Sequence, residues 1–582
     1  MSAVASAIAA SAPTPAPRRA WILSPAQDAL FVVGAPLLTL GAAVAAFAYF
    51  GAADATAYIV LLHVVFTVAH HLPTFIRVYG DTDLFRRFRW TFVLAPVFPL
   101  GFAGAALAYL NTHDYPVENV LFLWVLLALW DPWHFLMQHY GFTRIYDRHN
   151  AAPKKLAARM DLALSATWFV FIMLASGEWF ASILEDLFLT ANVPLAAVLP
   201  SAVIQGLTYV ALAAACVATA AYGVYLAWCR RHGFAVSRVK LALFVTMFGV
   251  MFIAYTPNPW ILAWAPGWTF AVGFAVIGVV HMTQYLAIVW RYNRSLAAQE
   301  GRARGGAFRA LHRRGGWIVG GAYVALCLAY GGALTSQHES RVLMSVLLAL
   351  GFTSTLLHYY FDGFIWKLRH RQNRENLGSA ANDGRGTDAA ATSWWNVARA
   401  YSPAGVLARQ AAYFGVPLTT LSIGAYFVLQ GPGANYVGYM LRGSVLYSQG
   451  EEQQALVQAR TALESMEWQL PLVRRLAEVQ PTAAREAKLA FLLYNRSQYR
   501  EILLPTLTGA AMDAESLARH RASVAEAARI LERALERGGS IGQVGREEMR
   551  REDATRTLAG WKKELGREGL TTESLATEKS GN

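Results

Sequence analysis

Long apolar segments separated by short polar stretches occupy the first part of the chain. Ten of them approach or exceed the ~20 residues that a helix needs to cross a membrane. They lie at about 28–50, 54–77, 91–111, 117–146, 161–184, 204–228, 239–256, 266–292, 316–335 and 341–368. The pattern predicts an all-α fold, with a polytopic bundle of ten transmembrane helices over residues 28–370.

The segments that flank this bundle differ in composition. Residues 1–27 are rich in Ala, Ser and Pro and lack the apolar core of a signal peptide, which predicts a disordered leader that stays on the chain. Residues 371–400 are polar and rich in Gly, Ala, Asn and Asp, as in a linker. An apolar stretch within 401–431 is long enough for an eleventh membrane helix, which would place the C-terminus on the outer face, and the sequence leaves open whether it spans.

Residues 437–582 are charged, rich in Ala, Leu, Glu and Arg, and helically periodic, so they predict a soluble helical region. Small and apolar residues recur there at intervals similar to those of a tetratricopeptide repeat, namely Gly443, Leu446, Gly450, Ala455, Ala459 and Ala462. A second helix pair is expected within 485–507. A small helical bundle without repeats fits equally well, and either form suggests a region that binds a protein partner.

The overall composition favours the membrane interpretation. The chain has 582 residues, 55% of them hydrophobic and only 15% charged, with a mean hydropathy of +0.31. These values are typical of a protein whose main partner is the lipid bilayer. The net charge of +13 comes from residues between apolar segments, so no nucleic-acid partner is expected. The three cysteines, Cys216, Cys229 and Cys327, are too widely spaced for a disulfide framework.

Basic residues alternate between successive loops. Clusters at 18–19, 86–89, 148–159, 230–240, 302–314 and 369–374 precede the first predicted helix or follow an even-numbered one. The other loops contain almost no Lys or Arg. By the positive-inside rule this predicts an integral protein of a bacterial inner membrane with a cytoplasmic N-terminus.

Polar residues inside the apolar segments are concentrated in four of them. They are His63, His70, His71, Asp131, His134, His139, His281, His358 and Asp362. The next basic residue follows His70, His134, His281 and His358 after 7, 10, 10 and 9 positions. At ~1.5 Å per residue, the four imidazoles then lie roughly 10–15 Å inside the cytoplasmic face. Polar groups at such depth usually face the bundle interior and mark function, so this layer predicts a bound metal or haem.

The spacings indicate how the ligands divide. His358 and Asp362 share a helix face at i,i+4, and Asp131 and His134 share one at i,i+3, although Pro132 lies between them. Either pair would supply two ligands, or one ligand and the carboxylate that orients it.

Two further histidine pairs diverge on a regular helix. His71 points about 100° away from His70, so both serve one ion only if the helix is distorted or two ions are present. His139 diverges from His134 by about 140° and is either a ligand or a residue at the rim of the site. The polar residues expected to support the ligands are Asp131, Gln138, Gln284 and His63.

Imidazole and carboxylate without thiolate suit iron, zinc, copper or manganese. We favour non-haem iron, with two ions as an option. The segments WHFLMQHYGF and HYYFDGFIWK resemble, at the level of class, the histidine-rich membrane oxygenases such as desaturases, alkane hydroxylases and membrane carotene dioxygenases, although their HxxxH and HxxHH boxes are absent. The resemblance implies O₂-dependent oxidation of a lipid, hydrocarbon or isoprenoid that enters from the bilayer.

Three other interpretations stay open. Paired histidines, His70 with His134 or His281 with His358, would ligate haem b in an electron-transfer protein. A transporter would use the polar layer as an ion or substrate pathway. In a structural scaffold, the histidines would be interhelical hydrogen-bonding groups.

Overall fold

The structure is a computed structural model that describes residues 21–113, 120, 123–177, 201–256, 258–298, 309, 312, 317–336, 338, 340–365, 402–429, 436–479, 481–510, 513–537, 541, 543–544 and 547–566. These residues are almost entirely helical, as predicted, and their single pair of short strands, β1 (Gln543–Val544) and β2 (Glu547–Glu548), is antiparallel. The chain divides into two compact units, Met1–Gly177 with Thr208–Thr419, and Glu178–Leu207 with Thr420–Asn582.

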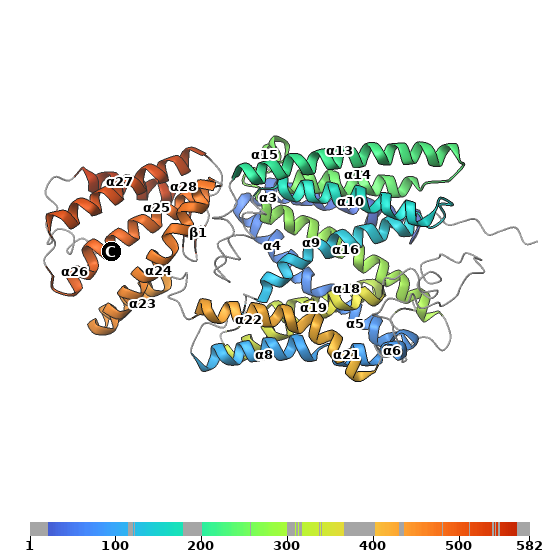
Figure 1. Ribbon diagram of the computed structural model, residues 1–582, viewed down its shortest axis with the longest axis horizontal. Coiled ribbons are helices and arrows are strands. Elements are labelled where there is room, and N and C mark those ends of the chain that lie inside the picture. Colours follow the sequence, from blue (N-terminus) through green and yellow to red (C-terminus); the bar gives the residue numbers. More distant parts are fainter. Residues whose placement is uncertain are drawn as a thin grey trace, which may run out of the picture. The chain divides into compact units, whose positions relative to one another are not determined.

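The first unit contains the predicted bundle (Figure 1). In chain order its elements are α2 (Pro25–Asp28), η1 (Ala29–Val33), α3 (Ala35–Phe50), α4 (Ala52–Ala69), α5 (His71–Gly80), α6 (Thr82–Arg87), α7 (Arg89–Leu94), α8 (Val97–Thr112), α9 (Trp124–Tyr146), α10 (Lys154–Ala175), α13 (Ser201–Arg231), α14 (Arg238–Tyr255), α15 (Pro259–Trp264), α16 (Phe270–Ala297), α18 (Trp317–Thr335), α19 (Arg341–Ile365), α21 (Pro403–Gln410), η5 (Ala411–Gly415) and α22 (Val416–Leu429). The first residues of α13 and the last of α22 fall in the second unit.

Eight helices among the described residues are long and apolar enough to cross a membrane, which is compatible with an integral membrane protein. They are Ala52–Gly80, Arg89–Thr112, Lys154–Ala175, Val203–Arg231, Arg238–Tyr255, Phe270–Ala297, Ile318–Thr335 and Arg341–Ile365. A bent pair, Pro25–Val33 with Ala35–Phe50, adds a ninth if it is one span. The fourth predicted span, 117–146, contains the helix α9, which is not among the eight. The helix α22, in the expected eleventh span, is not among them either.

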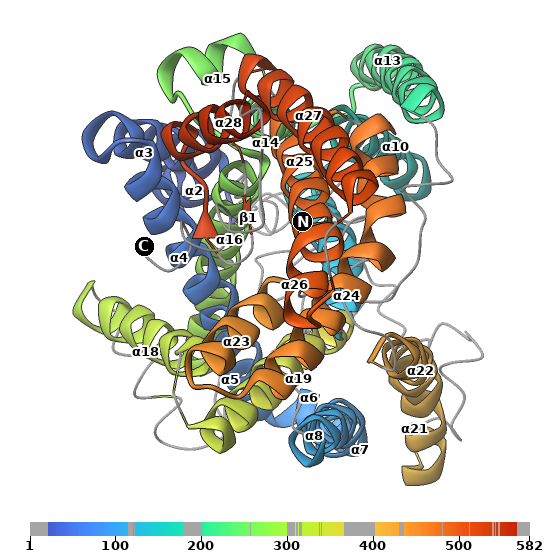
Figure 2. The ribbon, with the colours of Figure 1, turned by 90° about the vertical axis from the view of Figure 1, so that its left-hand side faces the viewer.

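The two most deeply buried of these helices are α16 and α19. α16 packs on α3, α4, α5 and α14, and Figure 2 shows it in the middle of this group. α19 packs on α5, α8, α9 and α18. Side chains on these two helices therefore point into the interior of the bundle, where the predicted polar layer requires them.

The second predicted span is interrupted at the site. α4 ends at Ala69, His70 is in a turn, and α5 begins at His71. Pro73 lies in the first turn of α5, where it has no N–H to donate and its ring would clash with the carbonyl four residues earlier. The helix therefore breaks just before the proline, between two candidate ligands.

The N-terminal prediction is wrong in part. Residues 21–27, expected to belong to a disordered leader, are folded onto the first unit: Ile22 is buried, and the backbone N–H groups of Ile22 and Leu23 donate to Asp28, each at 2.8 Å. Ser24 caps α2. Residues 1–20 and the linker at 371–400 lie outside the described residues.

The second unit contains a helical C-terminal region. Its elements are α23 (Tyr436–Ser448), α24 (Glu452–Val479), α25 (Ala483–Ser497), η6 (Gln498–Leu503), α26 (Leu504–Leu507), α27 (Ala514–Arg537), the two strands and α28 (Arg551–Leu565). Successive long helices pack on each other, α23 on α24, α24 on α25, α25 on α27, and α27 on α28.

The proposed repeat is not confirmed by this arrangement. Gly443 does lie close to α24, because a Cβ on it would come within 3.6 Å of the Ala455 carbonyl oxygen. However, residues 485–507 do not form the expected second pair. They continue from α25 through the π-helical turn η6 into α26, so this segment is one irregular helix.

Candidate metal centre

Three predicted ligands from three separate helices meet at their Nε2 atoms. His70 Nε2 lies 3.1 Å from His358 Nε2, and His358 Nε2 lies 3.3 Å from His134 Nε2. These residues come from the end of α4, from α19 and from α9. Asp362, one turn beyond His358, places Oδ2 3.8 Å from His134 Nε2 and 3.9 Å from His358 Nε2.

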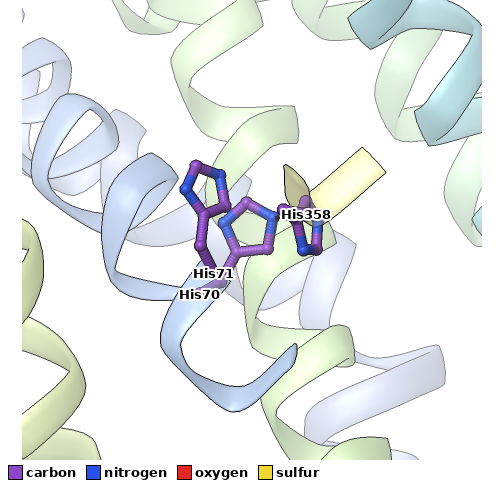
Figure 3. A group of neighbouring side chains, drawn as sticks. All are labelled: His70, His71 and His358. Atoms are coloured by element: carbon purple, nitrogen blue, oxygen red, sulfur yellow. Dashed lines mark hydrogen bonds between the residues drawn. The ribbon is translucent and has the colours of Figure 1, made fainter. Parts of the chain in front are cut away.

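Six of the predicted ligands form three overlapping groups in which all ligand atoms lie within 4.8 Å of one another. The groups are His70, His71 and His358; His70, His134 and His281; and His134, His358 and Asp362. All five histidines are buried. Figure 3 shows the first group, with the rings of His70 and His71 beside that of His358.

The break between α4 and α5 explains why adjacent histidines share one group. On a continuous helix His70 and His71 would point about 100° apart. In the turn at the break both rings reach His358, with ring centroids 4.4 and 4.7 Å away. The structure thus has a local interruption at His70, within a span that otherwise continues from Ala52 to Gly80.

Several ring nitrogens at this centre lack a hydrogen-bond partner within the described part of the chain. They are Nε2 of His71 and both ring nitrogens of His281, all buried. The ring of His281 lies 5.4 Å from that of His70 and 5.2 Å from that of His134. Buried polar atoms are nearly always paired, so the unpaired nitrogens suit a site in which one nitrogen of each neutral ring offers its lone pair to a cation.

Hydroxyl side chains that the sequence analysis missed lie within hydrogen-bond distance of the candidate ligands. Thr74 Oγ1 lies 2.7 Å from His358 Nδ1 and 2.5 Å from the Tyr285 hydroxyl, and Tyr285 donates to Asp362 Oδ1 at 2.7 Å. Ser354 Oγ lies 3.0 Å from His71 Nδ1.

A simple sequence pattern would have marked Thr74 and Tyr285 as candidates, without their role. Thr74 is four residues after His70, and Tyr285 is four after His281, so each shares a helix face with a ligand or follows it across the break. Hydroxyl side chains at i±4 from an intramembrane histidine are therefore a usable sequence signal.

Other predicted residues lie outside the three groups. His139, predicted as a ligand, contacts the rings of Phe244 and Phe248, with centroids 5.5 and 4.9 Å away. His63 Nε2 lies 3.3 Å from Thr67 Oγ1. Asp131 accepts a 2.9 Å hydrogen bond from the hydroxyl of Tyr359.

The two predicted glutamines support the backbone near the centre. Gln138 Nε2 donates to the carbonyl oxygen of His281 at 2.9 Å, and so ties α9 to α16 at a ligand. Gln284 Nε2 donates to the Val32 carbonyl oxygen at 2.9 Å, away from the ligand groups.

A second polar cluster, absent from the sequence analysis, consists of ion pairs. Lys240 Nζ lies 3.0 Å from Asp161 Oδ1 and 3.1 Å from Asp147 Oδ2, and Arg144 lies 2.6 Å from Asp161 Oδ2. Tyr222 donates to Asp161 at 2.9 Å. Lys240, which the sequence analysis counted among loop cations, is fully buried in the first turn of α14. Two cations balance two anions, as expected of ion pairs that stabilise the packing of helices.

Comparison of the chain with protein-family models, curated proteins and solved structures gives no match. The function is therefore inferred from the chemistry of the centre itself.

Proposed function

We propose that this protein is an integral membrane oxidoreductase that depends on a non-haem metal, most simply iron, bound by His70, His71, His134, His281, His358 and Asp362. The observation that carries the proposal is the convergence of three Nε2 atoms from three helices at separations of 3.1 and 3.3 Å. Ligands held at ~2.0–2.1 Å from one metal ion in tetrahedral or octahedral geometry lie roughly 2.9–3.4 Å apart. The nitrogens therefore have the spacing of a ligand shell.

The distribution of the ligands favours two neighbouring ions. Two ligands of one ion lie at most about 4.2 Å apart, twice the metal–ligand distance. Asp362 and His281 never fall in the same 4.8 Å group, and each joins the others through His134. One ion near Asp362 and a second near His281 would use five of the six residues, with His134 in both groups, and His71 would join through His70 or His358. Such a centre keeps positions open for a reactant, as a catalytic rather than a purely structural site requires.

The donor set suits a non-haem metal, and its geometry disfavours haem. Imidazole and carboxylate without thiolate suit iron, while zinc and copper fit the same donors. The two axial nitrogens of a haem lie on opposite sides of the iron. At the same metal–nitrogen distance of ~2.0 Å they would be about 4 Å apart, with the porphyrin between them. The 3.1 and 3.3 Å separations are too short for that, and His134 adds a third nitrogen to the same point.

A lipophilic substrate fits the surroundings of the centre. When bound, redox-active iron would supply the activation of O₂. Beside it, α9 presents Trp130 and Trp133 at 37% and 52% exposure on either side of Asp131, next to the ligand His134. In a bilayer this exposed aromatic surface would face lipid, from which a lipid, hydrocarbon or isoprenoid would approach.

The C-terminal region would bind a protein partner.

Metal analysis of the detergent-purified protein, combined with its absorption spectrum, tests the proposal. Two equivalents of iron per chain without a Soret band are expected. A sharp Soret band would establish the haem alternative. Protein that is monodisperse but holds no metal after supplementation with iron, zinc and copper would leave the histidines as interhelical hydrogen-bonding groups and overturn the proposal.

A further inference from the structure

Four side chains at the centre form a closed ring of contacts. The hydroxyl of Tyr285 donates to Asp362 Oδ1 at 2.7 Å, lies 2.5 Å from Thr74 Oγ1, and Thr74 Oγ1 lies 2.7 Å from His358 Nδ1. His358 and Asp362 complete the ring because they are one turn apart on α19. Thr74, on α5, and Tyr285, on α16, thus link the outer nitrogen of one candidate ligand to the carboxylate of another.

We propose that Thr74 and Tyr285 are positioning residues that fix His358 as the tautomer with hydrogen on Nδ1 and a lone pair on Nε2. This role in metal binding rests on the proposed metal centre, whereas the tautomer itself does not. Thr74 and His358 are fully buried and Tyr285 is nearly so, which keeps water from replacing any member of the ring.

Counting hydrogens along the ring gives the direction of each bond. A hydroxyl has one hydrogen to donate, and a carboxylate has none. Tyr285 gives its hydrogen to Asp362, so the hydrogen between Thr74 and Tyr285 comes from Thr74. The Thr74 oxygen must then accept from His358, which places the imidazole hydrogen on Nδ1. The lone pair of His358 Nε2 is left facing the centre.

A different contact gives His70 the same tautomer as His358. Its Nδ1 lies 3.3 Å from the carbonyl oxygen of Phe66, which can only accept, so the hydrogen of a neutral His70 is on Nδ1. The Nε2 lone pairs of His70 and His358 then face each other across 3.1 Å. The hydrogen bonds of Nδ1 hold both rings in this state, and a cation beside both nitrogens would relieve the repulsion between the two lone pairs. The ring thus gives the centre neutral imidazoles and an anionic carboxylate, a charge pattern that favours a divalent cation.

Histidine nitrogens can be observed directly by solid-state NMR of the full-length, metal-free protein in lipid with ¹⁵N-histidine. The His358 signal is identified by its loss in His358→Ala. We expect a protonated Nδ1 in the unchanged protein and in Thr74→Ser, which keeps the hydroxyl. Thr74→Val removes the acceptor, and Tyr285→Phe frees the Thr74 hydrogen to donate to Nδ1, so both should move the imidazole hydrogen to Nε2.

Two matched variants control for packing changes. Thr355→Val removes a buried hydroxyl that donates to Gly351 within α19, and Tyr323→Phe removes a buried hydroxyl without a hydrogen-bond partner in the described residues. Neither belongs to the ring, so both should keep Nδ1 of His358 protonated. If Thr74→Val and Tyr285→Phe also keep it protonated, the proposed ring is wrong.

Cobalt(II) affinity, measured by competition with a coloured chelator, tests the consequence for the metal. Loss of a residue that orients a metal-bound histidine typically lowers affinity ten- to a hundredfold. Thr74→Val and Tyr285→Phe should show this loss, whereas Thr74→Ser and the two control variants should bind as the unchanged protein does. Equal affinity in all variants would refute the positioning role. If the tautomer shifts as expected but the unchanged protein binds no cobalt, the metal centre fails while the assigned tautomer stands.

Discussion

The Nε2 atoms of His70 and His358 lie 3.1 Å apart although 288 residues separate them in the chain. Replacing His358 by Ala should abolish binding of the ion beside Asp362, because that ion would lose one of the three ligands in its group, His134, His358 and Asp362. His70→Ala, His134→Ala and His281→Ala should each lower the metal content as well. Metal stoichiometry of monodisperse protein measures the effect.

His139→Ala is the matched control for these variants. It removes another buried histidine of α9, but one that lies against Phe244 and Phe248 outside the ligand groups. Its metal content should equal that of the unchanged protein. Loss of metal in His139→Ala to the same extent as in His134→Ala would mean that any buried histidine of α9 matters, which contradicts the assigned ligand set.

Asp362→Asn separates charge from shape. The amide keeps the size of the side chain but removes the negative charge that faces His134 and His358 at 3.8 and 3.9 Å. Metal affinity should fall roughly ten- to a hundredfold if Asp362 only orients a neighbouring ligand, and further if it binds the ion directly. Titration with cobalt in the presence of a chelator distinguishes these ranges, and unchanged affinity would exclude Asp362 from the centre.

Much of the helical fold follows from the sequence because apolar length alone determines whether a helix can span a bilayer. Nine of the ten expected segments correspond to apolar helices of spanning length or to the bent pair. The remaining segment, 117–146, contains α9, which is helical but carries Asp131, His134, Gln138 and His139, and these polar residues lower its mean hydropathy. Among the helices that contribute candidate ligands, α9 is therefore the one that hydropathy recognises least.

The ligands could be predicted, but which of the nearby hydroxyl side chains orient them could not. His70, His134, His281 and His358 stand out because imidazoles are rare in apolar segments. Thr74 and Tyr285 do not, because hydroxyl side chains are common in membrane helices and their role depends on a contact between α5 and α16. His139 diverges from His134 by about 140° on a regular helix, so the sequence leaves it as a ligand or a rim residue, and the structure places its ring against Phe244 and Phe248.

A glycine pair on α18 tests whether helix packing holds His70 in place. A Cβ on Gly331 would come within 2.2 Å of the Val65 carbonyl oxygen and 2.8 Å of the Ala69 amide nitrogen. Because both are backbone atoms, Gly331→Ala should push α18 away from α4 just before His70, lowering both thermal stability and metal content. Gly332 has no neighbour within 4 Å, so Gly332→Ala should leave both unchanged or raise stability by up to about 1 kcal/mol through helix propensity. Equal behaviour of the two variants would contradict this packing.

The ion-pair cluster around Lys240 predicts a stability effect without a metal effect. Lys240→Met leaves Asp161 and Asp147 buried with one cation fewer, which typically costs about 3–5 kcal/mol. Lys155, which is exposed, provides the control Lys155→Met with little expected change. Unfolding in mixed detergent micelles measures both, and the double variant Lys240→Met with Asp161→Asn should recover part of the loss. A loss that is not recovered would point to packing of the lysine stem instead of charge.

The alternation of basic loops predicts the orientation of the bundle and hence the depth of the centre. Reporter fusions after about residues 115 and 260 should report an outer location, and fusions after about 155 and 310 a cytoplasmic one, because Lys and Arg are retained on the cytoplasmic side. The loop at 148–159 carries Arg148, Lys154, Lys155 and Arg159, whereas the preceding loop has neither lysine nor arginine. Substituting these four residues with Gln should weaken the cytoplasmic signal at 155 while the signal at 260 stays outer. A cytoplasmic signal at 115 in the unchanged protein would reverse α9 and place His134 and its partners nearer the outer face.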